Sequence, residues 1–139
     1  DEAFTLAVPA GHRLADQERV RVDDLEGETL LLLEDGHCLR DQALEVCSRI
    51  RVQEEQDYRA TSLETLRQMV AAGHGVTLMP QLAADSPVGA ARGLRSKTFV
   101  RPAPARTIGA IWRKSSTRAQ AIAAVSSAIR GAMKEEAKR

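Results

Sequence analysis

Cys38 and Cys47 are the only cysteines of the chain and the residues best suited to chemistry. Cys38 lies near the start of a predicted helix, where unpaired backbone N–H groups favour a thiolate over a thiol. His37 and Arg40 bring hydrogen-bond donors or positive charge close to it, whereas Asp41 opposes this effect unless it pairs with Arg40. These residue types predict a nucleophilic thiol that can attack the O–O bond of a peroxide.

The spacing of the two cysteines bears on whether they form a disulfide. Across a continuous helix, nine positions separate them by a rise of about 13 Å and turn them to opposite faces. A disulfide needs Cα atoms roughly 4.4 to 6.8 Å apart, so closure would require the segment to unwind, as in a switch. From the residues alone, two unrelated buried thiols remain the favoured interpretation, and a structural disulfide of a secreted domain is a further alternative.

Composition sets limits on the class of protein. With 139 residues, 43% hydrophobic and 28% charged, the chain is typical of one soluble globular domain. A net charge of +1 is too balanced for a nucleic-acid-binding face, so any DNA contact needs sequence outside this chain. No apolar run approaches a membrane span, and the scattered histidines and cysteines lack zinc-ligand spacing. Because the first residue is Asp1, we expect the chain to come from a longer protein.

The pattern of apolar residues predicts alternating strands and helices, and therefore an α/β sheet. Strands are predicted at 4–8, 29–33, 58–60, 76–79, 94–100 and 107–112. Helices are predicted at 37–50, from Leu63 to a stop at Gly73, and at 119–133, with a helical turn at 22–25. Thr61 and Glu64 form a predicted capping box, in which Thr61 caps the second helix and Glu64 reaches back.

Three stretches of the sequence resemble the hydrogen-peroxide-sensing branch of the LysR-type transcription regulators. They are Leu31 to Ala43 together with Cys47, Arg59 to Pro80, and Pro104 to Gly109. The second stretch is general to effector domains of LysR-type regulators, whereas the first, with both cysteines, is specific to peroxide sensors. The resemblance covers nearly the whole chain.

The resemblance implies a function and a set of site residues. Hydrogen peroxide would oxidise Cys38 to a sulfenic acid, Cys47 would resolve it as a disulfide, and transcription of antioxidant genes would change. No cofactor, metal or enzymatic turnover is implied. The expected peroxide pocket comprises His37, Arg40, Asp41 and Arg106.

The resemblance also implies an architecture and partners. The fold would be a periplasmic-binding-protein-like lobe with a parallel-rich sheet and flanking helices. Residues 9–105 would form the second lobe, and residues 1–8 and 106–139 the crossing strands and C-terminal elements of the first lobe. The DNA-binding helix-turn-helix would be absent from this chain. The full protein would be a cytoplasmic homotetramer that contacts DNA and RNA polymerase without any membrane.

Two other functions remain open at this point. In one, the chain is a LysR-type effector domain that binds a small organic anion, and its cysteines have no redox role. Its cleft would then include the helix start at Thr61 and Ser62, with Glu64 on the same helix. In the other, the chain is a thiol peroxidase, which the absence of a C-x-x-C motif disfavours.

Overall fold

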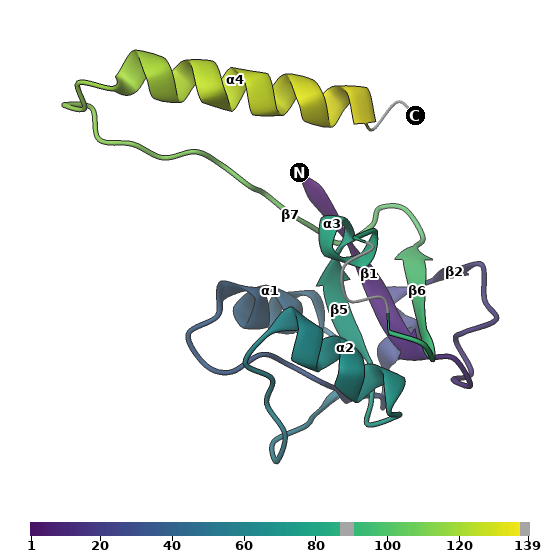
Figure 1. The fold of residues 1–139 in the computed structure, drawn as a ribbon. Coiled ribbons are helices and arrows are strands. Elements are labelled where there is room, and N and C mark those ends of the chain that lie inside the picture. Colours follow the sequence, from purple (N-terminus) through teal and green to yellow (C-terminus); the bar gives the residue numbers. More distant parts are fainter. Residues whose placement is uncertain (87–90, 137–139) are drawn as a thin grey trace. The chain divides into compact units, whose positions relative to one another are not determined.

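The computed structural model describes residues 1–86 and 91–136, which fall into two compact units, Asp1–Thr107 and Ile108–Arg139. The first unit contains the sheet and its flanking helices, and the described part of the second contains one long helix (Figure 1). All of the site residues predicted from the sequence lie in the first unit.

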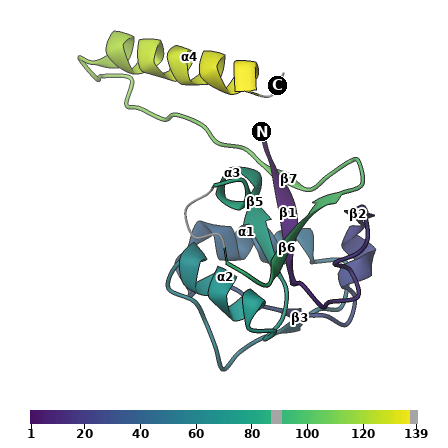
Figure 2. The same ribbon diagram turned by 45° about the vertical axis from the view of Figure 1, so that its right-hand side comes forward.

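The sheet of the first unit is built around β1 (Glu2–Pro9), whose central apolar run is buried. β1 pairs antiparallel with β5 (Thr77–Pro80) and with β6 (Leu94–Phe99), and Figure 2 shows it between these two strands. Its first residues also pair antiparallel with β7 (Ala105–Arg106). This central position explains why most of the segment is apolar and buried, since both of its faces are covered.

The remaining strands run in the direction opposite to β1. β2 (Arg19–Val20) pairs parallel with β6, and β3 (Thr29–Leu30) pairs parallel with β4 (Gln53–Glu54). A parallel bridge between Leu30 and Val76 connects β3 to the residue that precedes β5. The predicted α/β class with a parallel-rich sheet is therefore confirmed, and β1 is the strand that runs against the others.

The helices of the first unit follow the predicted order. They are η1 (Val22–Leu25), α1 (Cys38–Val46), α2 (Leu63–Ala71) and the short α3 (Gln81–Ala84). α1 is shorter than the predicted range 37–50, because the residues that follow it form turns. α2 ends as predicted at Gly73, whose φ of 87° is a left-handed conformation that glycine adopts without steric cost.

The cap of α2 differs from the prediction by one residue. Ser62, not Thr61, is the N-cap: its backbone is extended and its Oγ accepts a hydrogen bond from the Thr65 N–H at 3.1 Å. Glu64 does not reach back, because its carboxylate accepts a hydrogen bond from Gln68 one turn later. The physical reason is register, since only the residue immediately before the first helical position can bond the third N–H.

The core of the first unit is aliphatic, as the scarcity of aromatic residues predicts. It joins β1 and β5 to the buried sides of α1 and α2 and to the segment that follows β3. The largest fully buried side chains belong to Phe4, Leu6, Leu14, Leu25, Leu30, Leu31, Leu32, Leu66, Leu78 and Met79. This core fixes α1 from one side and leaves its other side toward solvent.

Three predicted strands are not found as predicted. The strand predicted at 29–33 covers only Thr29–Leu30, with a single bridge at Leu33. Residues 58–60 contribute only a single bridge at Ala60, and residues 107–112 form no strand in the described structure. Ile108 and Ile111 are exposed there, because the described residues offer 107–112 no neighbouring strand. An apolar stretch predicts a strand only where another strand can complete its hydrogen bonds.

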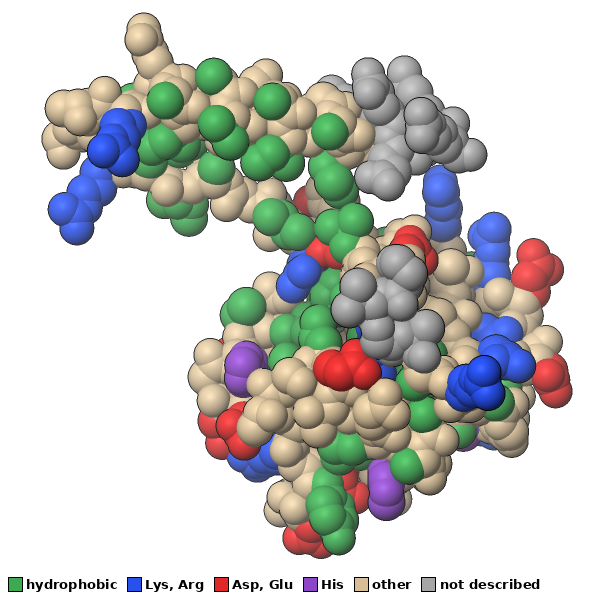
Figure 3. Space-filling model, viewed as in Figure 1, with side chains coloured by type: hydrophobic (Ala, Val, Ile, Leu, Met, Phe, Trp, Pro, Cys, Tyr) green, Lys and Arg blue, Asp and Glu red, His purple; other side chains and the backbone are tan. Residues whose placement is uncertain are grey.

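The second unit contains α4 (Ala119–Glu136), which confirms the predicted C-terminal helix. Apolar side chains lie along its exposed surface, as Figure 3 shows, and include Val125, Ile129 and Met133. No helix among the described residues is long and apolar enough to span a membrane.

Candidate redox site

Helix α1 carries one cysteine at each end. Cys38 is its first residue and is exposed to solvent, whereas Cys47 is its C-cap and is only 3% exposed. Both thiols are free. His37 is the N-cap residue with an extended backbone, is itself exposed, and has no capping hydrogen bond through its side chain to any described residue. Two thiols of one helix therefore lie in opposite environments, one accessible and one protected.

The helix also separates the two thiols. Because α1 is continuous from Cys38 to Val46, the rise to Cys47 is about 13 Å, roughly twice the largest Cα separation that a disulfide allows. The chain as it stands is thus a dithiol whose sulfur atoms cannot bond without rearrangement of α1.

Burial changes the acidity of Cys47. Desolvation raises the pKa of its thiol from 9.0 to about 11, since the surrounding core disfavours the thiolate. The backbone N–H of Cys47 donates to the carbonyl of Ala43, which keeps the residue within the last turn. Near neutral pH the thiol is therefore protonated and a poor nucleophile while it stays in the core.

Arg40 lies on the first turn of α1, two residues after Cys38, and its side chain is 10% exposed. Its Nε donates to Asp35 at 2.9 Å, and its Nη2 donates to Glu54 of β4 at 2.5 Å. The hydrogen bond to Glu54 is the main cause that raises the pKa of Arg40 above its ordinary value. The sequence predicts that the positive charge of Arg40 activates Cys38. In the structure that charge is already paired with two carboxylates, Asp35 and Glu54.

A second arginine completes this cluster. Arg59 pairs with Asp35 at 2.5 Å and approaches Glu54 at 3.6 Å, so each carboxylate lies between two arginines. We call Asp35, Arg40, Glu54 and Arg59 the α1 ion cluster. Asp41 is exposed and forms no ion pair with Arg40 or with any other described residue, so the pairing that the sequence left open is not found.

Arg106 lies on β7, where its Nε donates to Glu2 of β1 at 2.7 Å. Glu2 is buried, and its other carboxylate oxygen accepts the N–H of Leu82 at the start of α3. Arg106 borders a cavity of about 340 Å³ that also faces the C-terminal half of α1. The cavity is lined by Phe4, Gln42, Glu45, Val46, Pro104, Ala105, Arg106 and Thr107. Cys38 is not among these residues, so Arg106 faces the part of α1 that leads to Cys47.

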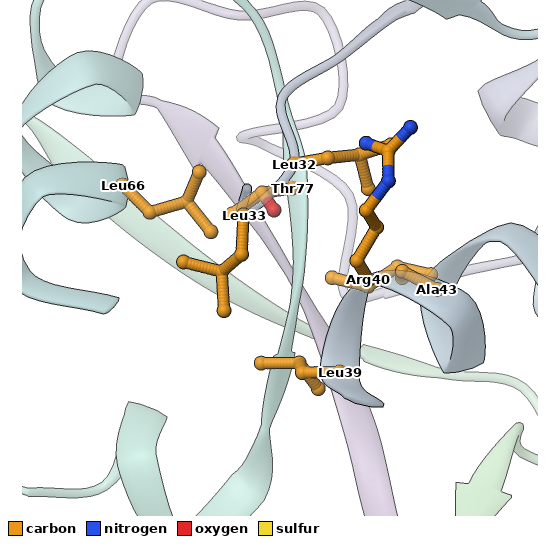
Figure 4. Close-up of a pocket in the computed structure, with 8 residues that line it drawn as sticks. Leu32, Leu33, Leu39, Arg40, Ala43, Leu66 and Thr77 are labelled. Atoms are coloured by element: carbon orange, nitrogen blue, oxygen red, sulfur yellow. The ribbon is translucent and has the colours of Figure 1, made fainter. Parts of the chain in front are cut away.

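A much smaller cavity lies between α1, α2 and β5, as Figure 4 shows. Its volume is about 10 Å³, and the side chain of Arg40 extends along it past Leu32. That volume admits at most one water-sized molecule, so this is a gap in the packing under α1 and not a ligand pocket.

The predicted effector-cleft residues Thr61, Ser62 and Glu64 lie at the start of α2 and border neither cavity. All three are exposed, and the hydroxyl of Ser62 is occupied by its capping hydrogen bond. The residues that the sequence prediction missed are those that hold the predicted ones: Glu2, Asp35, Glu54 and Arg59. No group of three or more potential metal ligands occurs among the described residues.

Comparisons with known proteins agree on one family. The family model for the LysR substrate binding domain matches residues 1–134. The chain is 46% identical over 133 residues to the Escherichia coli K12 protein named DNA-binding transcriptional dual regulator OxyR, covering 96% of this chain and 43% of that protein. It is 50% identical over 117 residues to the hydrogen peroxide-inducible genes activator of Dickeya chrysanthemi, covering 84% of this chain and 38% of that protein.

Solved structures give the same result. The reduced form of OxyR superposes with a TM-score of 0.80 at 44% identity, covering 95% of this chain and 61% of that one. The oxidised form superposes with a TM-score of 0.79 at 45% identity, covering 96% and 62%. The chain thus spans less than half the length of these curated relatives and less than two thirds of these solved chains.

Proposed function

The chain belongs to the LysR substrate-binding domain family, and on that basis we propose that it is the redox-sensing regulatory domain of a LysR-type transcription regulator. Hydrogen peroxide oxidises Cys38, a disulfide forms with Cys47, and this change switches transcription of antioxidant genes. The observation that carries the proposal is the placement of an accessible thiol and a buried thiol at the two ends of α1. Relatives named hydrogen peroxide-inducible genes activators support it.

The proposed chemistry has two steps. The Cys38 thiolate attacks one oxygen of hydrogen peroxide; an S–O bond forms, the O–O bond breaks, and hydroxide leaves to take up a proton. The Cys47 sulfur then attacks the sulfenic acid; an S–S bond forms, the S–O bond breaks, and a second water leaves. In total, two thiols lose two electrons and two protons, and one peroxide becomes two waters.

The second step requires a change of structure. Cys47 must leave its buried position or Cys38 must reach it, and both require α1 to lose helical turns. Oxidation at one atom is thereby converted into rearrangement of a whole helix, which is the event that a switch needs. A rise of about 13 Å along α1 between the two cysteines supports this role, because thiols already in contact would form a disulfide without any rearrangement of the helix.

The proposal also covers the lobes to which the residues belong and the partners of the full protein. Residues 9–105 form the second lobe of the regulatory domain, and residues 1–8 and 106–139 belong to the first lobe and the strands that cross to it. The full protein is a cytoplasmic homo-oligomer that binds DNA through a separate helix-turn-helix and contacts RNA polymerase. Peroxide is a stoichiometric signal for it and not a substrate that is turned over.

Counting of free thiols by mass spectrometry tests the proposal. After one equivalent of hydrogen peroxide, we expect the wild-type chain to lose two thiols and to gain a Cys38–Cys47 crosslink. Cys38→Ser should keep its remaining thiol, and Cys47→Ser should stop at a sulfenic acid on Cys38. Persistence of both thiols in the wild type would refute peroxide sensing and favour a domain with another effector.

A second assay separates a sensor from an enzyme. Without a reductant, a sensor consumes about one equivalent of peroxide and stops; with a thiol reductant present, further consumption is limited to the slow rate of its own re-reduction. Continuous, protein-dependent consumption of many equivalents would contradict the proposal and indicate a thiol peroxidase.

A further inference from the structure

The α1 ion cluster ties the first turn of α1 to other elements of the fold. Arg40 belongs to the first turn, between the two cysteines in sequence, and its guanidinium is tied to Glu54 on β4 and to Asp35 in the preceding loop. Glu54 is 14 residues from Arg40 in sequence, so the contact joins α1 to a separate element of the fold. Rearrangement of the first turn must therefore break or replace these contacts.

The first turn has few other attachments. The side chain of His37 makes no capping hydrogen bond with the described residues, Cys38 is exposed, and Asp41 is exposed. Leu39 packs into the core, and Arg40 supplies the polar contacts of the turn. At the other end, Cys47 is buried and the preceding Leu44 and Val46 pack against the core. Both ends of α1 are thus held by buried side chains, and at the N-terminal end the α1 ion cluster adds the polar contacts that restrain the first turn.

We propose that Glu54 is a positioning residue that, through Arg40, holds the first turn of α1 in its helical form and so favours the dithiol over the Cys38–Cys47 disulfide. This inference rests on the proposed function, because it presupposes that the disulfide forms. Glu54 touches neither sulfur atom; it acts on the equilibrium between the two states and not on the chemistry of either step.

Burial makes this contact stronger than an ordinary surface ion pair. The Arg40 side chain is 10% exposed and that of Glu54 is 26% exposed, so the pair is largely shielded from water. Asp35 would still hold the Nε atom of Arg40 after loss of Glu54. The Nη1 atom is already buried without a hydrogen-bond partner among the described residues, so loss of Glu54 would leave Nη2 without its partner as well. A charge-assisted hydrogen bond in such surroundings contributes more than a neutral one. Its loss from the dithiol state alone should shift the thiol–disulfide equilibrium constant about tenfold.

Titration with a glutathione redox buffer measures that constant. Oxidised glutathione takes two electrons and two protons from the dithiol and becomes two reduced glutathione molecules, while the Cys38–Cys47 bond forms. We expect Glu54→Gln to favour the disulfide about tenfold more than the wild type, which corresponds to a reduction potential lower by about 30 mV. The matched control is Glu55→Gln, which removes the neighbouring carboxylate; Glu55 forms no ion pair with any described residue and should match the wild type.

Two further variants make the test specific. Glu54→Asp keeps the charge on a shorter side chain and should lie between the wild type and Glu54→Gln; it also supplies the comparison if Glu54→Gln does not fold. In an Arg40→Gln background, Glu54→Gln should have no further effect, because the partner through which it acts has been removed.

Each other outcome overturns the inference. A folded Glu54→Gln chain with the wild-type equilibrium constant would show that the contact does not favour the dithiol. An equal shift in Glu55→Gln, or a full effect of Glu54→Gln without Arg40, would show that the effect does not pass through this pair. A wild-type chain that forms no Cys38–Cys47 disulfide in the buffer would overturn both this inference and the proposed function.

Discussion

Alkaline pH should destabilise the reduced chain through Cys47, and the size of the effect follows from its burial. Desolvation raises the pKa of this thiol from 9.0 to about 11 in the folded state. The protonated thiol is therefore favoured by folding, and this contribution is fully present below about pH 9 and is lost as pH rises toward 11. A difference of about two pKa units amounts to about 2.7 kcal/mol when the loss is complete.

The comparison of wild type with Cys47→Ser isolates this contribution, because serine does not ionise in this range and every other titrating group is shared. Between about pH 8 and about pH 10 the free energy of unfolding of the wild type should fall by about 1.3 kcal/mol relative to the variant. Urea unfolding in the presence of a phosphine reductant measures it. Ultraviolet absorbance of the thiolate in Cys38→Ser gives the pKa of Cys47 directly.

A constant difference between the two chains over this pH range would refute the reasoning. It would mean that Cys47 ionises equally in the folded and unfolded states, so that water reaches it in the folded chain. The buried, protonated resolving thiol in the proposed mechanism would then be wrong, whereas the oxidation of Cys38 would be unaffected.

Two predictions concern local structure, and urea unfolding measures both. Ser62→Ala should lower the free energy of unfolding by about 1 kcal/mol through loss of the α2 cap, whereas Thr61→Ala should have little effect. A larger loss of stability in Thr61→Ala than in Ser62→Ala would instead identify Thr61 as the cap. Gly75→Ala should cost at least about 2 kcal/mol, because a Cβ there would lie 2.5 Å from the carbonyl oxygen of Thr29, while Gly11→Ala, which meets nothing within 4 Å, should be tolerated.

The elements that the sequence predicts well are those specified by local patterns. β1 follows from a mostly apolar run, and α2 from a periodic apolar face and a glycine stop, although its N-cap is Ser62 and not the predicted Thr61. The predicted strand at 107–112 shows the limit of such patterns. Its apolar residues carry the right composition, but a strand exists only with a hydrogen-bonded neighbour, and composition does not say whether the chain supplies one.

The residues of the candidate site also divide into those that local sequence predicts and those that it does not. Cys38 and its position at a helix start could be predicted, because helix and cysteine are adjacent in sequence. The partners of Arg40 could not, since Glu54 is 14 residues away and Arg59 comes later still, and nothing in their local sequence indicates a shared contact. Burial of Cys47 likewise depends on the packed core, which local sequence does not reveal.

The expected order of oxidation, Cys38 before Cys47, bears on which step limits the rate of disulfide formation. Cys38 is exposed, whereas Cys47 is buried and its raised pKa keeps it protonated near neutral pH, so the proposed mechanism predicts that oxidation begins at Cys38. The resulting sulfenic acid must then wait until α1 opens, because about 13 Å of helix separates it from the second thiol. We therefore predict that formation of the disulfide is limited by opening of the helix and not by thiol reactivity. Variants that stabilise α1 should therefore lengthen the lifetime of the sulfenic acid without changing the rate at which peroxide oxidises Cys38.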